Sequence, residues 1–197
     1  MFISFEGLDG SGKTTQAALL ADWLRAEGRD VVAVREPGGT AAGERVREVL
    51  LDPAMHILPW PEALLYAAAR AQLVGEVIRP ALERGAVVIA DRYIDSSLAY
   101  QGAARGLGMD AVLAVNAAAT GGLLPDRTLL LELPEAEAAG RRGGGPDRIE
   151  AEHATFHSAV ADGFRAAAGR FPDRVRAVDA SGSPETVAAR VRWAAGL

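Results

Sequence analysis

The sequence predicts an α/β fold in which a five-stranded parallel sheet carries helices on both faces. Three observations lead to this fold class. Short runs rich in Val, Ile and Leu alternate with longer segments rich in Ala, Leu and Arg. Several short runs are apolar at successive positions, which is typical of strands covered on both faces. Glycines stand where the longer segments should end, at Gly28, Gly85, Gly121 and Gly122.

The elements follow from this alternation in chain order. The apolar runs predict strands at residues 2–6, 31–34, 86–90, 128–133 and 175–180. The longer segments predict helices at about residues 13–26, 43–51, 61–84, 109–120, 150–169 and 184–194. Because strands and helices take turns along the chain, consecutive strands should run parallel with a helix between them.

Composition narrows the class of protein. At about 150 residues per domain, a chain of 197 residues is expected to form a single domain, residues 1–197. The net charge of −5 provides no basic patch for nucleic acid, and the absence of cysteine excludes disulfides and thiolate sites. Residues 112–124 are too short an apolar stretch to span a bilayer. We expect a soluble, cytoplasmic protein with no signal peptide and with neither nucleic-acid nor membrane partners.

Residues 7–14, GLDGSGKT, match the phosphate-binding pattern G-x-x-x-x-G-K-[ST] between a strand and a helix. Glycines allow backbone N–H groups to converge on phosphate oxygens, and the helix directs its positive end at the same charge. The pattern predicts a nucleoside triphosphate site and hence the three-layer fold of P-loop NTPases. The expected ATP-binding residues here are Gly7, Asp9, Gly10, Ser11, Gly12, Lys13, Thr14 and Thr15.

A second polar group follows the third predicted strand, in VVIADRY at residues 87–93. Because ligands bind at the carboxyl ends of parallel strands, Asp91 should lie beside the phosphate loop. Asp91 and the Thr14 hydroxyl are candidate ligands of Mg²⁺, the expected cofactor, and the Arg92 guanidinium can grip a phosphate. We expect Lys13, Asp91 and Arg92 to be catalytic.

Six stretches stand in an order and spacing that resemble one family. They are FISFEGLDGSGKTTQ, REPGGT, LLYAAARAQ, DRYIDSSLAYQG, PDRTLLLEL and DRIE. The chain is similar to thymidylate kinases of the bacterial type, which transfer a phosphoryl group from ATP to dTMP. The resemblance covers almost the whole length and implies one nucleoside monophosphate kinase domain that forms a homodimer.

The resemblance also implies roles in binding the acceptor nucleotide. Asp9 would accept a hydrogen bond from the sugar 3′-hydroxyl, while Arg35 and Arg92 would surround the acceptor phosphate. Pro37 would form a rigid turn lining the base pocket. Tyr66 would stack on thymine, and Arg70, one helical turn further, would donate to a thymine carbonyl.

Three more acceptor residues follow in SSLAYQG. Tyr100 is similar to a family tyrosine that fills the space of a ribose 2′-hydroxyl. Ser97 and Gln101 match polar positions that face the base. A steric wall together with an unpaired hydroxyl would reject ribonucleotides.

The segment RRGGGPDRIE, residues 141–150, resembles the family's lid over the triphosphate. Glycines followed by proline cannot form a stable helix interior. Since the phosphate loop itself contains no arginine, a lid arginine should complete the ATP site. We expect Arg148 in this catalytic role, assisted by Arg141 or Arg142.

The sequence leaves two alternatives to a thymidylate kinase and one alternative metal site. A related kinase could act on another monophosphate or on a deoxynucleoside, for which Glu6 or Glu36 would be the base. A nucleotide-dependent switch protein is the other rival, but Asn116 is followed by Ala and not by the Lys of N-K-x-D. His153 and His157 suggest zinc, although Ala154 replaces the Glu of H-E-x-x-H and a solvated helix face is expected.

Overall fold

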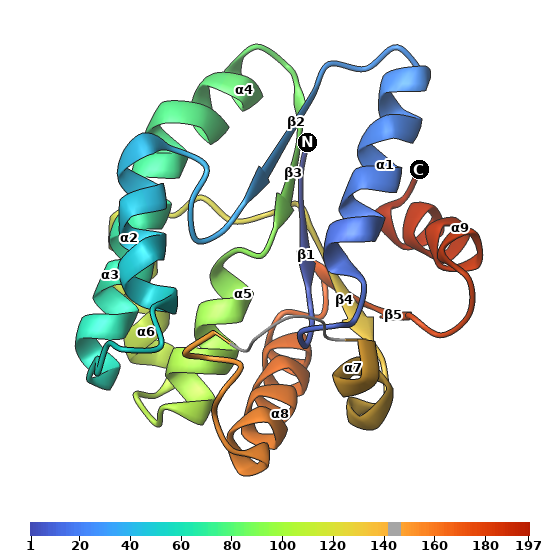
Figure 1. The fold of residues 1–197 in the computed structure, drawn as a ribbon. Coiled ribbons are helices and arrows are strands. Elements are labelled where there is room, and N and C mark those ends of the chain that lie inside the picture. Colours follow the sequence, from blue (N-terminus) through green and yellow to red (C-terminus); the bar gives the residue numbers. More distant parts are fainter. Residues whose placement is uncertain (142–146) are drawn as a thin grey trace.

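The computed structural model describes residues 1–141 and 147–197, which form a five-stranded parallel sheet between two layers of helices (Figure 1). The strand order is β2-β3-β1-β4-β5, and every pair of neighbours is parallel. The strands are β1 (Phe2–Glu6), β2 (Val31–Arg35), β3 (Val87–Asp91), β4 (Arg127–Glu132) and β5 (Val175–Asp179). The predicted fold class is confirmed.

Helices cover both faces of this sheet. The α-helices are α1 (Lys13–Ala26), α2 (Ala41–Leu51), α3 (Pro59–Leu73), α4 (Arg79–Glu83), α5 (Ile94–Ser97), α6 (Met109–Thr120), α7 (Glu135–Arg141), α8 (Ala154–Arg170) and α9 (Pro184–Ala195). Two π-helical segments, η1 (Val74–Ile78) and η2 (Leu98–Ala104), continue α3 and α5.

Successive residues of a strand point to opposite faces of the sheet and pack into two separate hydrophobic cores. This explains why the strand sequences are apolar at consecutive positions. Ile3 and Phe5 of β1 pack with α1 and α9 on one face. Phe2 of the same strand packs with Leu73 and Ile78 of the α3–η1 layer on the other face. Because both faces are buried, apolar residues are favoured at successive strand positions.

The structure differs from the sequence prediction most clearly in four places, one of which is α7, where no helix was predicted. The helix expected at residues 61–84 is divided into α3, η1 and α4. Residues 94–104, for which no helix was predicted, form α5 and η2. Helix α8 begins at Ala154 and not at residue 150, because residues 148–151 form a turn.

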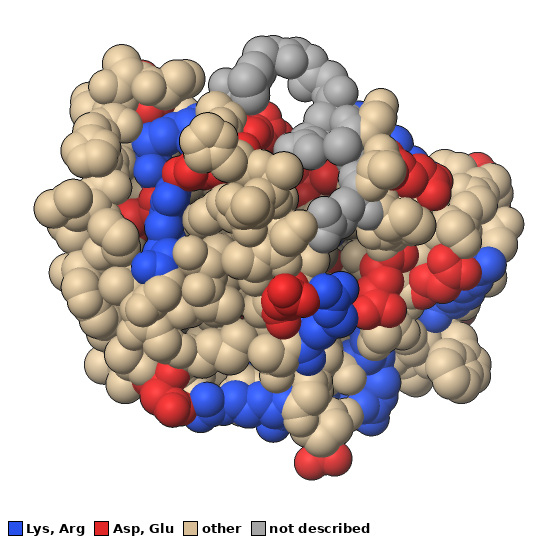
Figure 2. Space-filling view, turned by 90° about the horizontal axis from the view of Figure 1, so that it is seen from below, with Lys and Arg blue, Asp and Glu red and all other residues tan. Residues whose placement is uncertain are grey.

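The carboxyl ends of the strands point towards one end of the molecule, the lower end in Figure 1, where β1 passes into α1. Figure 2 views the molecule from this end and shows acidic and basic side chains interspersed on it. Among the described residues, no helix is long and apolar enough to cross a membrane.

Candidate active site

The phosphate loop, residues 7–12, needs glycine at two positions for steric reasons. Gly7 has φ +135°, and a Cβ there would lie 2.5 Å from the Leu131 carbonyl oxygen. Gly10 has φ +86°, and a Cβ there would lie 2.1 Å from the Ala138 carbonyl oxygen. A side chain at either position would collide with backbone. Ser11 Oγ is buried in this loop without a hydrogen-bond partner, so a phosphate oxygen would satisfy it.

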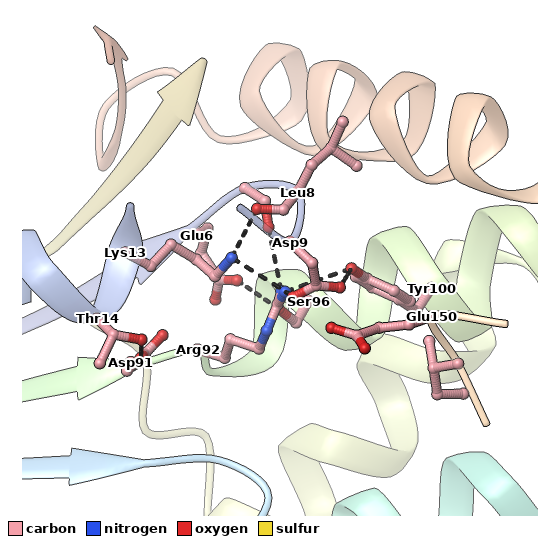
Figure 3. A network of polar contacts seen from close by, with 12 residues as sticks. Glu6, Leu8, Asp9, Lys13, Thr14, Asp91, Arg92, Ser96, Tyr100 and Glu150 are labelled. Carbon is pink, nitrogen blue, oxygen red and sulfur yellow. Dashed lines mark hydrogen bonds and ion pairs between the residues drawn. The ribbon is translucent and has the colours of Figure 1, made fainter. Parts of the chain in front are cut away.

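Lys13, Thr14 and Asp91 lie beside the loop (Figure 3). Lys13 Nζ donates to the Leu8 carbonyl oxygen at 2.8 Å and lies 3.8 Å from Asp9 Oδ1. Thr14 Oγ1 donates to Asp91 Oδ2 at 2.5 Å, which joins the first turn of α1 to the end of β3. One hydroxyl and one carboxylate in the cleft are suitable ligands for a divalent cation that also binds nucleotide phosphates. The predicted metal residues therefore fit such a cation.

The zinc site considered for His153 and His157 gains no support from the surrounding side chains. His153 precedes the first residue of α8, and His157 Nε2 is buried without a hydrogen-bond partner. Within the described ranges, no group of three or more His, Cys, Asp or Glu side chains could hold a metal. A cation at Thr14 and Asp91 would accordingly depend on phosphate oxygens for most of its ligands.

Arg92 contacts both the phosphate loop and Tyr100 of η2 (Figure 3). Its NH2 group donates to Asp9 Oδ1 at 2.5 Å. Its NH1 group donates to Ser96 Oγ at 2.9 Å and to the Gly7 carbonyl oxygen at 3.2 Å. The Tyr100 hydroxyl donates to Asp9 Oδ2 at 3.1 Å, and the guanidinium lies 5.3 Å from the Tyr100 ring centroid. Arg92 is thus held in place by protein groups alone.

Burial and neighbouring charges together shift the pKa values of Asp9 and Lys13. Burial acts to raise the pKa of Asp9, but the charges of Arg92 and Lys13 outweigh it and hold that pKa well below its usual range. Burial, followed by repulsion from Arg92, lowers the pKa of Lys13 to about 8, although Asp9 opposes this shift. An incoming polyphosphate would therefore stabilise the charged form of Lys13.

Arg70 of α3 is buried and fully engaged by protein groups. Its Nε donates to Glu36 Oε2 at 2.8 Å, and its NH2 donates to the Tyr93 carbonyl oxygen at 3.0 Å. Its NH1 donates to Ser97 Oγ at 2.9 Å and also to Asn116 Oδ1. Donation to a thymine carbonyl would require Arg70 to share one of these N–H groups, so that role stays a prediction.

Four other residues expected at the base and sugar line the same cleft: Pro37, Tyr66, Tyr100 and Gln101. Tyr66 is half-buried on α3, and Tyr100 is buried on η2. Burial raises the pKa of Tyr100 above its ordinary value, against the opposing charge of Arg92, so its hydroxyl stays neutral at pH 7 and can donate.

Two arginines occupy the edge of the cleft near α2. Arg35 is half exposed, and its NH2 group donates to both Glu44 carboxylate oxygens, at 2.9 and 3.1 Å. Arg47 NH1 donates to the Pro37 carbonyl oxygen at 3.0 Å, and Arg47 also lines the cleft. Arg47 is not predicted from the sequence, because an arginine on a helix belongs to no motif and is usually solvated. Its place one helical turn after Glu44 was the available signal.

The arginines of the predicted lid lie in different places. Arg141 ends α7, pairs with Glu137 at 2.6 Å and lines the cleft. Arg148 does not line it: its NH2 lies 2.7 Å from Glu62 Oε2, and its Nε donates to the Leu50 carbonyl oxygen at 2.7 Å. Arg142 lies outside the described residues. The structure places Arg148 against α2 and α3, and its catalytic role stays a prediction.

A single cleft of about 800 Å³ brings most of the predicted residues together. Those that line it are Asp9, Gly10, Ser11, Gly12, Lys13, Thr14, Thr15, Arg35, Pro37, Tyr66, Arg70, Asp91, Arg92, Ser97, Tyr100, Gln101 and Arg141. Besides Arg47, the lining includes residues that the sequence analysis did not place at the ATP or acceptor site: Gln16, Glu36, Leu51, Ser96, Asp147, Ile149 and Glu150. Ala180 and Gly182 from the loop after β5, and Pro184 and Val187 of α9, also line the cleft. Gln16 Nε2 of α1 donates to the Pro184 carbonyl oxygen at 2.9 Å.

This arrangement is that of a P-loop protein: a phosphate loop follows the central strand of a parallel sheet, and the cleft of about 800 Å³ beside it is large enough for ligands beyond the phosphates. The thymidylate kinase family model matches residues 5–191. The chain is 51% identical to the thymidylate kinase of Gloeobacter violaceus, covering 98% of this chain and 93% of that protein. It is 52% identical to that of Deinococcus radiodurans, with 99% and 95% covered.

A solved structure agrees with these relatives. The crystal structure of thymidylate kinase from Ehrlichia chaffeensis superimposes with a TM-score of 0.82 at 33% identity, covering 100% of this chain and 98% of that one. The chain belongs to the thymidylate kinase family.

Proposed function

We propose that the chain transfers the terminal phosphoryl group of ATP to dTMP, forming ADP and dTDP. The observation that carries this proposal is the continuity of the cleft. It runs from the phosphate loop, past Arg92, to the pocket formed by Tyr66, Ser97 and Gln101. Two nucleotides bound at its ends would meet with their phosphates beside Arg92.

The phosphate-loop end suits the donor. Backbone N–H groups, Lys13 and the unpartnered Ser11 hydroxyl would bind the triphosphate, and the adenine would lie against residues 180–184. Thr14 and Asp91 would hold Mg²⁺, which, when bound, supplies positive charge to the transferring phosphoryl group.

The chemical step requires positioning and charge neutralisation more than proton transfer. A phosphate oxygen of dTMP is already ionised at neutral pH, so no strong base is needed. The guanidinium of Arg92 would offset the repulsion between the two sets of phosphates, with Arg35, Arg47 and Arg141 at the rim of the same cleft. Asp9, held by Arg92 and Tyr100, keeps a carboxylate available for the sugar 3′-hydroxyl.

The rival function, a kinase that phosphorylates a deoxynucleoside, would require a carboxylate base beside the acceptor hydroxyl. Glu6 is fully buried, does not line the cleft, and accepts hydrogen bonds from Tyr93 N and Ser96 Oγ. Glu36 does line the cleft, and its Oε1 has no hydrogen-bond partner, but its Oε2 is bound by Arg70. Only Glu36 therefore keeps this rival open, and a test of acceptors distinguishes the two.

ADP formation with ATP and Mg²⁺ should be measured separately with dTMP, dUMP, UMP, dCMP, AMP and thymidine. We expect the highest kcat/KM with dTMP. Turnover of thymidine without turnover of dTMP would establish the nucleoside kinase instead. Slow ATP hydrolysis that no acceptor accelerates would favour the switch protein.

We also propose that the protein acts in the cytoplasm, since charged nucleotides do not cross membranes unaided. In addition, we propose that it is a homodimer. Large apolar side chains are exposed on and between α2 and α3: Val49, Met55, Leu58, Trp60 and Leu64. An exposed apolar patch of this kind favours association with a second copy. Light scattering should give twice the chain mass, and the Trp60→Glu variant should give the mass of one chain.

A further inference from the structure

Glu62 of α3 is a fully buried carboxylate that no part of the proposed mechanism uses. Three side chains converge on it, and we call the four residues the Glu62 cluster. Gln101 Nε2 donates to Glu62 Oε1 at 2.9 Å. Arg105 donates to Oε1 at 3.2 Å and to Oε2 at 3.1 Å, while Arg148 NH2 lies 2.7 Å from Oε2.

This cluster settles which way the Gln101 amide faces. A carboxylate beside two guanidinium groups offers only acceptors, so Gln101 must turn its NH2 group towards Glu62. Its carbonyl oxygen then faces away from Glu62. Gln101 lines the cleft, whereas Glu62 does not, and no described residue donates a hydrogen bond to Gln101 Oε1. The carbonyl oxygen is therefore the end of the amide available to a ligand.

We propose that Glu62 is a positioning residue for acceptor specificity, because it holds the Gln101 carbonyl oxygen towards the acceptor base. This inference rests on the proposed function. Thymine and uracil carry a hydrogen on N3 and can donate to such an oxygen. Cytosine has a lone pair on N3, so two acceptors would face each other. A site built to accept a hydrogen bond rejects an analogue that cannot donate one.

The test compares two acceptors that differ only at N3 and C4 of the ring, dTMP and 5-methyl-dCMP. The specificity ratio is kcat/KM for dTMP divided by kcat/KM for 5-methyl-dCMP. In Glu62→Gln, the new amide can donate to Gln101 Oε1, so the Gln101 amide is free to turn over. We expect the ratio to fall about tenfold or more, mainly through a higher KM for dTMP, since one hydrogen bond of about 1.4 kcal/mol corresponds to tenfold.

A double-mutant cycle shows whether Glu62 acts through Gln101. Gln101→Leu should lower the ratio by a similar factor, and adding Glu62→Gln to it should lower the ratio no further. A purely structural role of Glu62 would instead reduce turnover of both acceptors and leave their ratio unchanged. The matched control is Glu152→Gln, because Glu152 lies 2.6 Å from Arg105 and makes no described contact with Gln101. It should keep the wild-type ratio.

A wild-type ratio in folded Glu62→Gln overturns the inference. Should Glu62→Gln fail to fold, Glu62→Asp replaces it, because the shorter side chain withdraws the carboxylate from Gln101 but keeps its charge beside the two arginines: a wild-type ratio overturns the inference and a reduced ratio supports it. A wild-type enzyme that does not phosphorylate dTMP would contradict the proposed function itself, which is a separate and recognisable result.

Discussion

At the scale of single residues, Arg92 shows how the site is organised before any ligand binds. Its φ of +72° lies in the left-handed region, which costs a non-glycine residue about 1–3 kcal/mol. The backbone N–H of Arg92 donates to the Phe5 carbonyl oxygen, and its side chain is held by Asp9 and Ser96. These contacts offset the strain and fix the guanidinium where the two phosphates would meet.

Tyr100 provides a test of sugar selectivity. Tyr100→Phe removes the hydroxyl that donates to Asp9, so the carboxylate loses one of its fixed partners beside the sugar. We expect the preference for dUMP over UMP, which differ only in the 2′-hydroxyl, to narrow by about tenfold. Steady-state kinetics with both acceptors measure this. An unchanged preference would show that another group excludes the ribose.

Glu6 makes the stability depend on pH. Burial, followed by the charge of Asp95, raises the pKa of Glu6 to about 8 from its ordinary 4.5, so the folded state binds a proton that the unfolded state releases between these values. The free energy of unfolding should therefore fall as pH rises through this window, by up to about 1.4 kcal/mol per pH unit.

Urea unfolding of wild type and Glu6→Gln at about pH 5.5 and about pH 7.5 measures this effect. The wild type should lose more stability than the variant between the two pH values. Equal losses would mean that Glu6 is ionised throughout.

At the scale of elements, segment 147–150 is a tight turn bound to two helices. Asp147 Oδ1 accepts hydrogen bonds from the backbone N–H groups of Ile149 and Glu150, at 2.8 and 2.9 Å. Arg148 then joins the turn to the Leu50 carbonyl oxygen of α2 and to Glu62 of α3. Since Arg70 lies two turns beyond Glu62, the turn is attached to the helix that contributes to the proposed base pocket.

Two arginine variants separate anchoring from catalysis. Arg148→Ala should lower the free energy of unfolding by about 1–3 kcal/mol, because it removes a cation from a buried carboxylate. Arg141→Ala should change stability by less than about 0.5 kcal/mol, because its pair with Glu137 is exposed, yet lower kcat by at least about tenfold. Chemical denaturation and turnover assays give both quantities. The opposite pattern would support the catalytic role that the sequence predicts for Arg148.

The helices and strands that can be predicted from the sequence are those marked by a pattern in their own residues. The strand β1 and the helices α1 and α6 have the predicted bounds, because apolar periodicity and glycine stops define them. By contrast, η2 depends on tertiary packing of Ala99 and Tyr100 against α8. In the site, the phosphate loop follows from spacing alone, whereas the places of Arg47 and Arg148 depend on which helices pack together.

At the scale of the whole molecule, the topology explains why one edge of the sheet holds the chemistry. The central strands β1 and β3 end side by side, with Phe5 opposite Asp91 in the register. The phosphate loop therefore follows one strand and the Asp91–Arg92 pair follows its neighbour. The pocket that we propose for the acceptor is completed from outside the sheet by α3 and η2. The central claim is that two nucleotides meet head to head at this edge.

A crystal structure with ADP and dTMP bound together tests this claim most directly. The account predicts ADP on the phosphate loop, thymine against Tyr66 with N3 near Gln101 Oε1, and the dTMP phosphate within hydrogen-bond distance of Arg92. A dTMP molecule bound elsewhere, or with its phosphate beyond the reach of Arg92, would contradict it.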